Sequence, residues 1–200
     1  MTVDARTIAV YDAKAQDYAD HFDSAGKPGA HLRRFMAALP TGGRVLDLGC
    51  GPANASRFMI EAGFDVMALD ASAEMVRVAA ELNGVDATLG TFDDLKEVAA
   101  FDGIWANFSL LHAPQVDLPR HLSAIARALR PGGVFHIGMK VGTGTARDGM
   151  DRRYTYVTAQ GLADLLAVAG LNVTDTDTGH EVGLAGTDDP WVVMMAVNHA

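Results

Sequence analysis

Short apolar runs alternate along the chain with segments in which apolar residues recur every three or four positions. The runs are typical of buried strands, and the spaced positions are typical of helices that cover a sheet. The alternation predicts an α/β fold, a three-layer αβα sandwich around a seven-stranded, mostly parallel sheet. The predicted strands are Arg44–Leu48, Asp65–Leu69, Ala87–Leu89, Gly103–Ala106, Val134–Met139, Asn172–Asp175 and Trp191–Val197.

Helices are predicted between most of these strands, as crossover connections between parallel strands require. They are Ser56–Ala62, Ala73–Leu82, Leu118–Leu129 and Ala159–Ala169. Only a non-helical segment joins the last two strands, so the last strand is predicted to be antiparallel. Two further helices, Val3–Phe22 and Pro28–Leu39, precede the first strand and are expected to form an N-terminal helical cap over residues 3–39. Residues 1–200 are expected to form a single domain.

The composition narrows the class of protein. No apolar run approaches the roughly 20 residues that span a bilayer, and the first residues lack a signal-peptide pattern, so a cytoplasmic protein without membrane contact is expected. The 25 acidic residues outnumber the 16 basic ones, which argues against a nucleic-acid partner. A single cysteine, Cys50, and seven histidines without paired ligand spacing predict no metal site. The oligomeric state stays open.

A glycine-rich turn follows the first predicted strand. The sequence VLDLGCG occupies residues 45–51, and its glycines allow the backbone to approach a ligand closely. The second strand leads to Asp70, 19 residues beyond Gly51, where a carboxylate can accept hydrogen bonds from both hydroxyls of a ribose. Together the turn and the acid predict a nucleoside-binding site.

Two residues favour S-adenosylmethionine (SAM) over a nicotinamide dinucleotide at this site. A dinucleotide fingerprint places glycine or alanine where this chain has Asn54. Asp47 also interrupts the apolar strand just before the glycines, and a carboxylate there suits a cationic ligand. SAM carries an α-ammonium and a sulfonium but no pyrophosphate, so it suits this turn better.

VLDLGCG, the acid at Asp70 and LRPGG at residues 129–133 make the chain resemble class I SAM-dependent methyltransferases from Val3 to Ala169. The nearest resemblance is to a small bacterial type, of the methyltransferase domain 11 or 25 kind, which includes quinone-biosynthesis and other small-molecule enzymes. Members open with a tyrosine-bearing helix, like YDAKAQDYADHF at residues 11–22. The resemblance implies a Rossmann-like methyltransferase fold, SAM as cofactor and S-adenosylhomocysteine (SAH) as product.

The resemblance also implies which positions hold the cofactor. Asp47, Gly49 and Gly51 would lie along the methionine part, and Asp70 would bind the ribose. Ala71, Met75 and Phe92 would contact adenine, while Asp93 would accept its amino group or cap the following turn. The implied set is Tyr11, Tyr18, Asp47, Gly49, Cys50, Gly51, Asp70, Ala71, Met75, Thr91, Phe92, Asp93, Asn107, Phe108 and Leu110.

Three of these positions have a structural alternative. Tyr11 and Tyr18, seven positions apart on one helical face, either close over the methionine end or anchor the helix in the core, and both interpretations carry equal weight. Cys50 is interpreted as a small apolar side chain that packs in the turn.

The chemistry of methyl transfer demands alignment more than a covalent residue, because it is an in-line displacement. His112 follows the fourth strand and is the best candidate for a catalytic base. A structural hydrogen-bonding role for His112 is the favoured alternative. His136, inside an apolar strand, is expected to be a hydrogen-bonded core residue.

The segment after the fifth strand carries the main indication about the acceptor. Basic residues gather at 140–153 in an otherwise acidic chain, beside the carboxyl ends of the strands. We hypothesise that Lys140, Arg147 and Tyr154 hold an anionic or aromatic small molecule. Local pairing of the basic residues with Asp148 and Asp151 is the alternative, with equal weight.

The sequence therefore favours a SAM-dependent methyltransferase that acts on a small molecule. Two alternatives remain open. One is methylation of a protein or RNA, although the net charge of −9 argues against RNA. The other is a non-catalytic SAM-binding regulatory protein.

Overall fold

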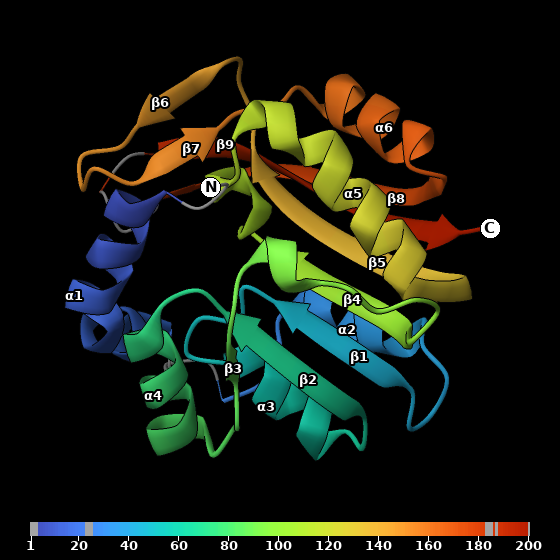
Figure 1. Cartoon of the computed structure of the whole chain (residues 1–200), viewed down its shortest axis with the longest axis horizontal. Coiled ribbons are helices and arrows are strands. Elements are labelled where there is room, and N and C mark those ends of the chain that lie inside the picture. The colour runs from blue at the N-terminus through green and yellow to red at the C-terminus, as the bar shows by residue number, and fades with distance from the viewer. Residues whose placement is uncertain (1–3, 23–25, 183–185, 187, 200) are drawn as a thin grey trace.

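The computed structural model describes residues 4–22, 26–182, 186 and 188–199. One seven-stranded sheet runs through the molecule in the order β3-β2-β1-β4-β5-β9-β8 (Figure 1). Its strands are β1 Arg44–Leu48, β2 Asp65–Asp70, β3 Thr88–Leu89, β4 Phe101–Asn107, β5 Leu129–Lys140, β8 Leu171–Val182 and β9 Asp188–Asn198. The first five are parallel, and β9 is antiparallel to both β5 and β8. The predicted α/β fold with an antiparallel last strand is confirmed.

Helices cover both faces of the sheet. They are α1 Ala5–Phe22, α2 Ala30–Ala37, α3 Asn54–Glu61, α4 Ala73–Asn83, α5 Leu118–Ala128 and α6 Ala159–Val168. Short 3₁₀ turns lie at Phe92–Asp94, Leu110–His112 and Gln115–Asp117. Val3, where the sequence predicted the first helix to begin, and residues 24–25 of the predicted break between the first two helices lie outside the described residues.

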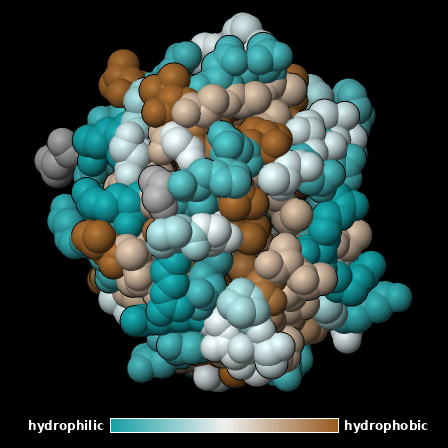
Figure 2. All heavy atoms as spheres, turned by 90° about the vertical axis from the view of Figure 1, so that its right-hand side faces the viewer, coloured by the Kyte–Doolittle hydropathy of each residue, from teal (hydrophilic) through white to brown (hydrophobic). Residues whose placement is uncertain are grey.

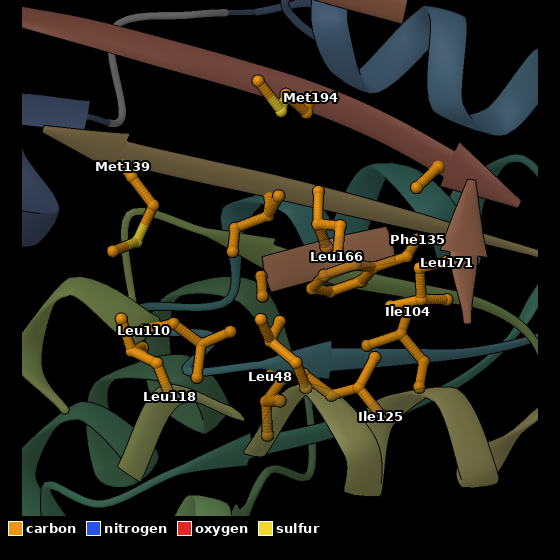
Figure 3. Close-up of a cluster of buried hydrophobic side chains, with 14 of the residues drawn as sticks. Leu48, Ile104, Leu110, Leu118, Ile125, Phe135, Met139, Leu166, Leu171 and Met194 are labelled. Carbon is orange, nitrogen blue, oxygen red and sulfur yellow. The ribbon is translucent and has the colours of Figure 1, made fainter. Parts of the chain in front are cut away.

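The larger core lies between the sheet and the pair α5 and α6 (Figure 3). Phe135 of β5 packs there with Ile125 of α5 and Leu166 of α6, and all three are 0% exposed. Burying a side chain of this size stabilises a fold by roughly 1.5–3 kcal/mol. A second core, with Phe35 and Met59, joins α2 and α3 to the opposite face. The two cores fix helices on both faces of the sheet.

The fold differs most from the sequence prediction in two places, while β5 and β9 begin five and three residues earlier than predicted. β8 was predicted over Asn172–Asp175, whereas the strand extends to Val182. The prediction missed the extension because β8 lies at the edge of the sheet, and its polar sequence TDTDTGHE lacks the apolar pattern of a buried strand. Residues 145–155 contain a hairpin, β6 Thr145–Arg147 with β7 Arg153–Thr155, where no strand was predicted. All three residues of β6 are exposed, so its sequence carries no core-facing alternation.

The outer surface shows no helix that could cross a membrane among the residues that the structure describes. On the face seen from the right-hand side of Figure 1, polar and apolar side chains alternate in small areas (Figure 2). The carboxyl ends of β1, β2 and β4 point away from that face, toward α1 (Figure 1).

Candidate active site

A cavity of about 550 Å³ lies at the carboxyl ends of β1, β2 and β4. Most of the residues that the sequence predicted for cofactor, acceptor or base line it together. They are Tyr11, Tyr18, Asp47, Gly49, Cys50, Gly51, Asp70, Ala71, Met75, Thr91, Phe92, Asn107, Phe108, His112, Lys140 and Tyr154. Asp93, Leu110 and Arg147 are predicted site residues that do not line it.

The turn between β1 and α3 explains why glycine is needed there. Gly49 has a φ of +81°, a conformation that side chains disfavour. A Cβ on Gly49 would lie 2.4 Å from the Cβ of Ser109, whose hydroxyl donates a 2.6 Å hydrogen bond to the carbonyl of Leu48. Ser109 therefore locks the turn from the β4 side, which the sequence did not indicate.

Two acids line the cavity, the buried Asp47 and the half-buried Asp70. Asp47 is 2% exposed and accepts a 2.7 Å hydrogen bond from the Ser56 hydroxyl, and burial raises the pKa of its carboxyl to about 7. Asp70 accepts hydrogen bonds from the backbone N–H groups of Gly51 and Ser72, at 2.8 and 2.9 Å. Burial also raises the pKa of Asp70. A ligand with a cationic group or hydroxyls would offset the cost of removing both carboxylates from water.

These residues fit SAM. The acids suit its positive charges, and the glycine turn gives backbone access. Each Asp70 oxygen already accepts one N–H and keeps a further lone pair for a ribose hydroxyl. Met75 and Phe92 add apolar surface suited to an adenine ring.

Helix α1 closes one side of the cavity with Tyr11 and Tyr18. Their rings meet edge to face with centroids 5.6 Å apart, and both line the cavity. Asp12 ties α1 to the start of α4 by accepting a 2.6 Å hydrogen bond from the Ser72 hydroxyl. The sequence gave no sign of this contact, since the two residues lie 60 positions apart.

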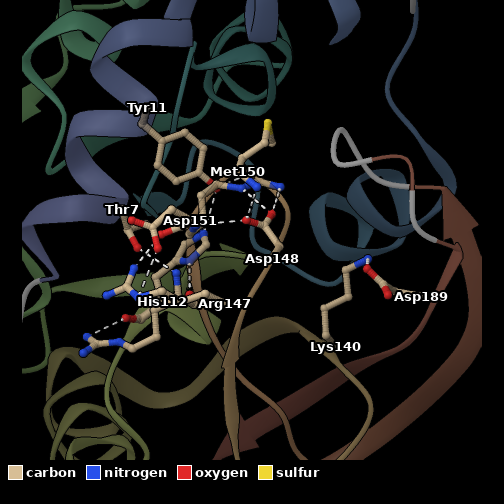
Figure 4. Close-up of polar contacts among 11 residues, drawn as sticks. Thr7, Tyr11, His112, Lys140, Arg147, Asp148, Met150, Asp151 and Asp189 are labelled. Carbon is tan, nitrogen blue, oxygen red and sulfur yellow. Dashed lines mark hydrogen bonds and ion pairs between the residues drawn. The ribbon is translucent and has the colours of Figure 1, made fainter.

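His112 has both ring nitrogens engaged (Figure 4). The carbonyl of Arg153 can only accept, so Nδ1–H donates to it at 2.8 Å, and Nε2 accepts the Tyr11 hydroxyl proton at 2.8 Å. Burial lowers the pKa of His112 to about 4. The imidazole is therefore neutral at physiological pH, and its geometry supports the structural alternative over a free base.

Arg152 was part of the predicted basic segment but was not singled out, and it lines the cavity. It forms a buried ion pair with Asp148 at 2.7 Å, each side chain 5% exposed. The same guanidinium lies 3.3 Å from the Tyr11 hydroxyl and sits over the Tyr11 and Tyr154 rings. Arg152 thus joins the β6–β7 hairpin to α1.

Comparisons with known proteins agree with this site. A family model described as a methyltransferase domain matches residues 45–133. The chain is 38% identical over 106 residues to a malonyl-[acyl-carrier protein] O-methyltransferase of Pectobacterium atrosepticum, covering 51% of this chain and 41% of that one. It is 37% identical over 132 residues to the cypemycin N-terminal methyltransferase of a Streptomyces species, covering 62% and 54%.

A solved structure matches nearly the whole chain. It is the 1,6-didemethyltoxoflavin-N1-methyltransferase of Burkholderia thailandensis, with bound 1,6-didemethyltoxoflavin and S-adenosylhomocysteine. The TM-score is 0.75 at 25% identity, over 98% of this chain and 88% of that one. Residues 45–133 therefore match a methyltransferase domain, and the chain as a whole has the fold of a SAM-dependent methyltransferase. It spans about half the length of the curated relatives that it matches.

Only two of the three residues predicted to hold the acceptor line the cavity. Lys140 and Tyr154 line the cavity, whereas Arg147 does not and instead pairs with Asp4 at 2.9 Å and with Asp151 at 3.4 Å. Lys140 is itself paired, with its Nζ 3.1 Å from an Asp189 oxygen (Figure 4). Local ion pairing, the alternative considered from the sequence, therefore occupies Arg147.

Asp93 and Leu110 also lie outside the cavity. Asp93 forms an ion pair with Arg120 on α5 and does not line the cavity. Asp94 instead caps the turn, accepting the backbone N–H of Thr91 at 2.8 Å. Leu110 is 0% exposed and packs in the larger core (Figure 3). Within the described ranges, no group of three or more histidines, cysteines or acids is arranged to hold a metal ion.

Proposed function

We propose that this chain transfers a methyl group from SAM to a small-molecule acceptor. The observation that carries the proposal is one continuous cavity. It joins the glycine turn and the two acids to a second end lined by Lys140 and Trp191. Its volume of about 550 Å³ is in the range of small-molecule sites, roughly 300–1,000 Å³. The relatives named above support methyl transfer as the reaction.

The residues of the cavity have separate tasks in this proposal. When bound, SAM supplies a methyl group on a positively charged sulfur, open to attack by a lone pair. Asp47 and Asp70 hold the cofactor, and the rings of Tyr11 and Tyr18 keep water from it. His112 has no free nitrogen, so the acceptor itself must bring an unprotonated lone pair or lose its proton to water.

A peptide acceptor is the second candidate. It is favoured by the 37% identity to a relative named for the N-terminus of cypemycin. The acidic surface argues against RNA as acceptor, because a net charge of −9 repels phosphates.

Two measurements test the proposal. Calorimetric titration with SAM and SAH should show binding, and Asp70→Ala should weaken it. The protein is then incubated with methyl-labelled SAM and bacterial extract separated into small molecules, protein and RNA. Label is expected in the small-molecule fraction, with no label when the Asp70→Ala variant replaces the protein.

The other outcomes decide against the proposal in different ways. Absence of SAM binding would overturn it entirely. Label in the protein or RNA fraction would replace the acceptor class, and binding without any labelled product would favour the non-catalytic regulatory protein.

A further inference from the structure

The cavity continues past the cofactor-binding turn to the ends of β5 and β9. These strands lie two and three places from β1 in the sheet. Trp191 is the first residue of β9 that pairs with β5, and its partner there is Lys140. Both residues line the cavity. His31, at the start of α2, meets Trp191 edge to face at 5.7 Å and is held by Asp177 at 2.9 Å. The far end of the cavity therefore has an aromatic corner of fixed geometry.

Lys140 places a charged donor beside this aromatic corner. Its side chain is 11% exposed and is 3.1 Å from Asp189, which is 24% exposed. The pair balances its own charge, so a ligand that adds a full negative charge gains little from Lys140. The ammonium has three N–H bonds, however, and can donate to an uncharged oxygen or nitrogen as well as to Asp189.

Asn107 adds a second donor whose orientation is set by its neighbours. The amide oxygen of Asn107 accepts a 3.0 Å hydrogen bond from Nε2–H of His136. His136 is 0% exposed and stacks on Trp105 with centroids 3.6 Å apart. Because His136 takes the oxygen, Asn107 offers its NH₂ group to the cavity that it lines.

The charges around the cavity do not favour an anion. The acids that line it are Asp4, Asp47, Asp70, Glu181 and Asp189, and the lysines and arginine are Lys27, Lys140 and Arg152. Arg152 is balanced by Asp148, Lys140 by Asp189, and Asp4 by Arg147, and the remaining acids Asp47, Asp70 and Glu181 still outnumber Lys27. An acceptor carrying a carboxylate or phosphate would meet a wall with more acids than bases.

We infer that this end of the cavity binds an uncharged, planar heteroaromatic acceptor. Its ring lies against Trp191 and His31, and its carbonyl or ring-nitrogen lone pairs accept hydrogen bonds from Lys140 and Asn107. The inference rests on the proposed function, since it names the class of the methyl acceptor. Of the two classes that the sequence suggested, anionic or aromatic, it selects the aromatic one.

Binding of chosen probes in the presence of saturating SAH tests the inference. Pteridine-2,4-dione is the heteroaromatic probe, benzene-1,3-dicarboxylate the aromatic anion and propane-1,2,3-tricarboxylate the non-aromatic anion. Calorimetry gives the affinities. Tryptophan fluorescence gives an independent signal, because the chain has two tryptophans and both line the cavity. The dione should bind at least about tenfold more tightly than either anion, as the aromatic and donor contacts predict.

Variants assign the binding to the proposed contacts. Trp191→Leu and Asn107→Leu should each weaken dione binding by about tenfold. Neither disrupts an ion pair, and thermal unfolding checks that both are folded. Lys140→Met should weaken binding as well, whereas Lys96→Met, an exposed lysine away from the cavity, should leave it unchanged.

The outcome also separates the inference from the proposed function. If either anion binds as tightly as the dione, if the dione does not bind, or if Trp191→Leu and Asn107→Leu bind it normally, the inference is wrong. If SAH binds and label still reaches the small-molecule fraction, the proposed function stands in each of these cases. Failure of SAH itself to bind would overturn both.

Discussion

Asp47 is a residue whose ionisation depends on what occupies the cavity. It is 2% exposed, accepts a hydrogen bond from the Ser56 hydroxyl, and has a pKa that burial raises from 3.8 to about 7. A cation placed beside it favours the ionised carboxylate. In the ligand-free protein the raised pKa makes the stability of the fold depend on pH. The contribution of the protonated Asp47 to the stability of the fold is fully present below pH 3.8 and is lost as the pH rises toward 7.

SAM affinity should therefore rise with pH between about 5.5 and 7, a range below the titration of the SAM α-amino group. The limit is about tenfold per pH unit, reached where Asp47 is mostly protonated before binding. Calorimetry at several pH values measures this slope. Asp47→Asn should bind SAM more weakly and with a shallower profile, because Asp70 also has a raised pKa, and an equal slope in the variant would show that Asp47 is not the titrating group.

Gly49 and Ser109 show how a motif residue depends on a partner outside the motif. The left-handed φ alone favours glycine, and the 2.4 Å approach to the Ser109 Cβ excludes any side chain. The sequence identified the first member of this pair and could not identify the second, which belongs to a segment 60 residues later.

At the scale of elements, the N-terminal half of α1 rests on the β6–β7 hairpin. Thr7 accepts a 2.9 Å hydrogen bond from the backbone N–H of Arg153, and Arg147 pairs with Asp4. Tyr11 contacts both His112 and Arg152. Lys14, with non-helical φ and ψ of −122° and 16°, separates this half from the part that carries Tyr18. The wall over the cavity is thus held by contacts between distant segments.

Arg152→Met should weaken SAH binding by about tenfold and lower the melting temperature, because it leaves Asp148 buried without its cation. Tyr11→Phe keeps the ring and should have a smaller effect on both. Calorimetry and thermal unfolding measure these changes, and hydrogen exchange at residues 5–14 reports whether α1 loosens. Arg120→Met, which breaks the exposed pair with Asp93, is the matched control. Equal losses in Arg120→Met would mean that charge alone, and not the hairpin contact, matters.

At the scale of the whole molecule, ligand binding should couple to global stability. The cavity lies between α1, α2, α3 and the sheet, so a ligand there contacts elements from both halves of the chain. SAH at about 100 times its dissociation constant should stabilise the fold by about 2.7 kcal/mol. For 200 residues this corresponds to a rise in melting temperature of about 5–11 °C. Differential scanning calorimetry measures it, and adenosine alone at equal concentration should raise the temperature less.

Much of the fold could be predicted because its signals are local. The bounds of β1, β2 and α4 differ from the predicted ones by at most a residue, since each element has its own apolar period and a turn or cap beside it. The extended β8 and the β6–β7 hairpin could not be predicted, because their polar sequences are strands only by virtue of their neighbours.

The sequence by itself determined the α/β alternation, the glycine turn and the acids Asp47 and Asp70, and through them the resemblance to SAM-dependent methyltransferases and the expected cofactor. These features depend on residues close together in the chain. Only the tertiary structure decided that Arg152 and not Arg147 lines the cavity. It also decided that the Tyr11 hydroxyl donates a hydrogen bond to His112 and that Lys140 forms an ion pair with Asp189. The last pair lies 49 positions apart and the tyrosine and histidine 101, so no local pattern encodes which partner each side chain meets.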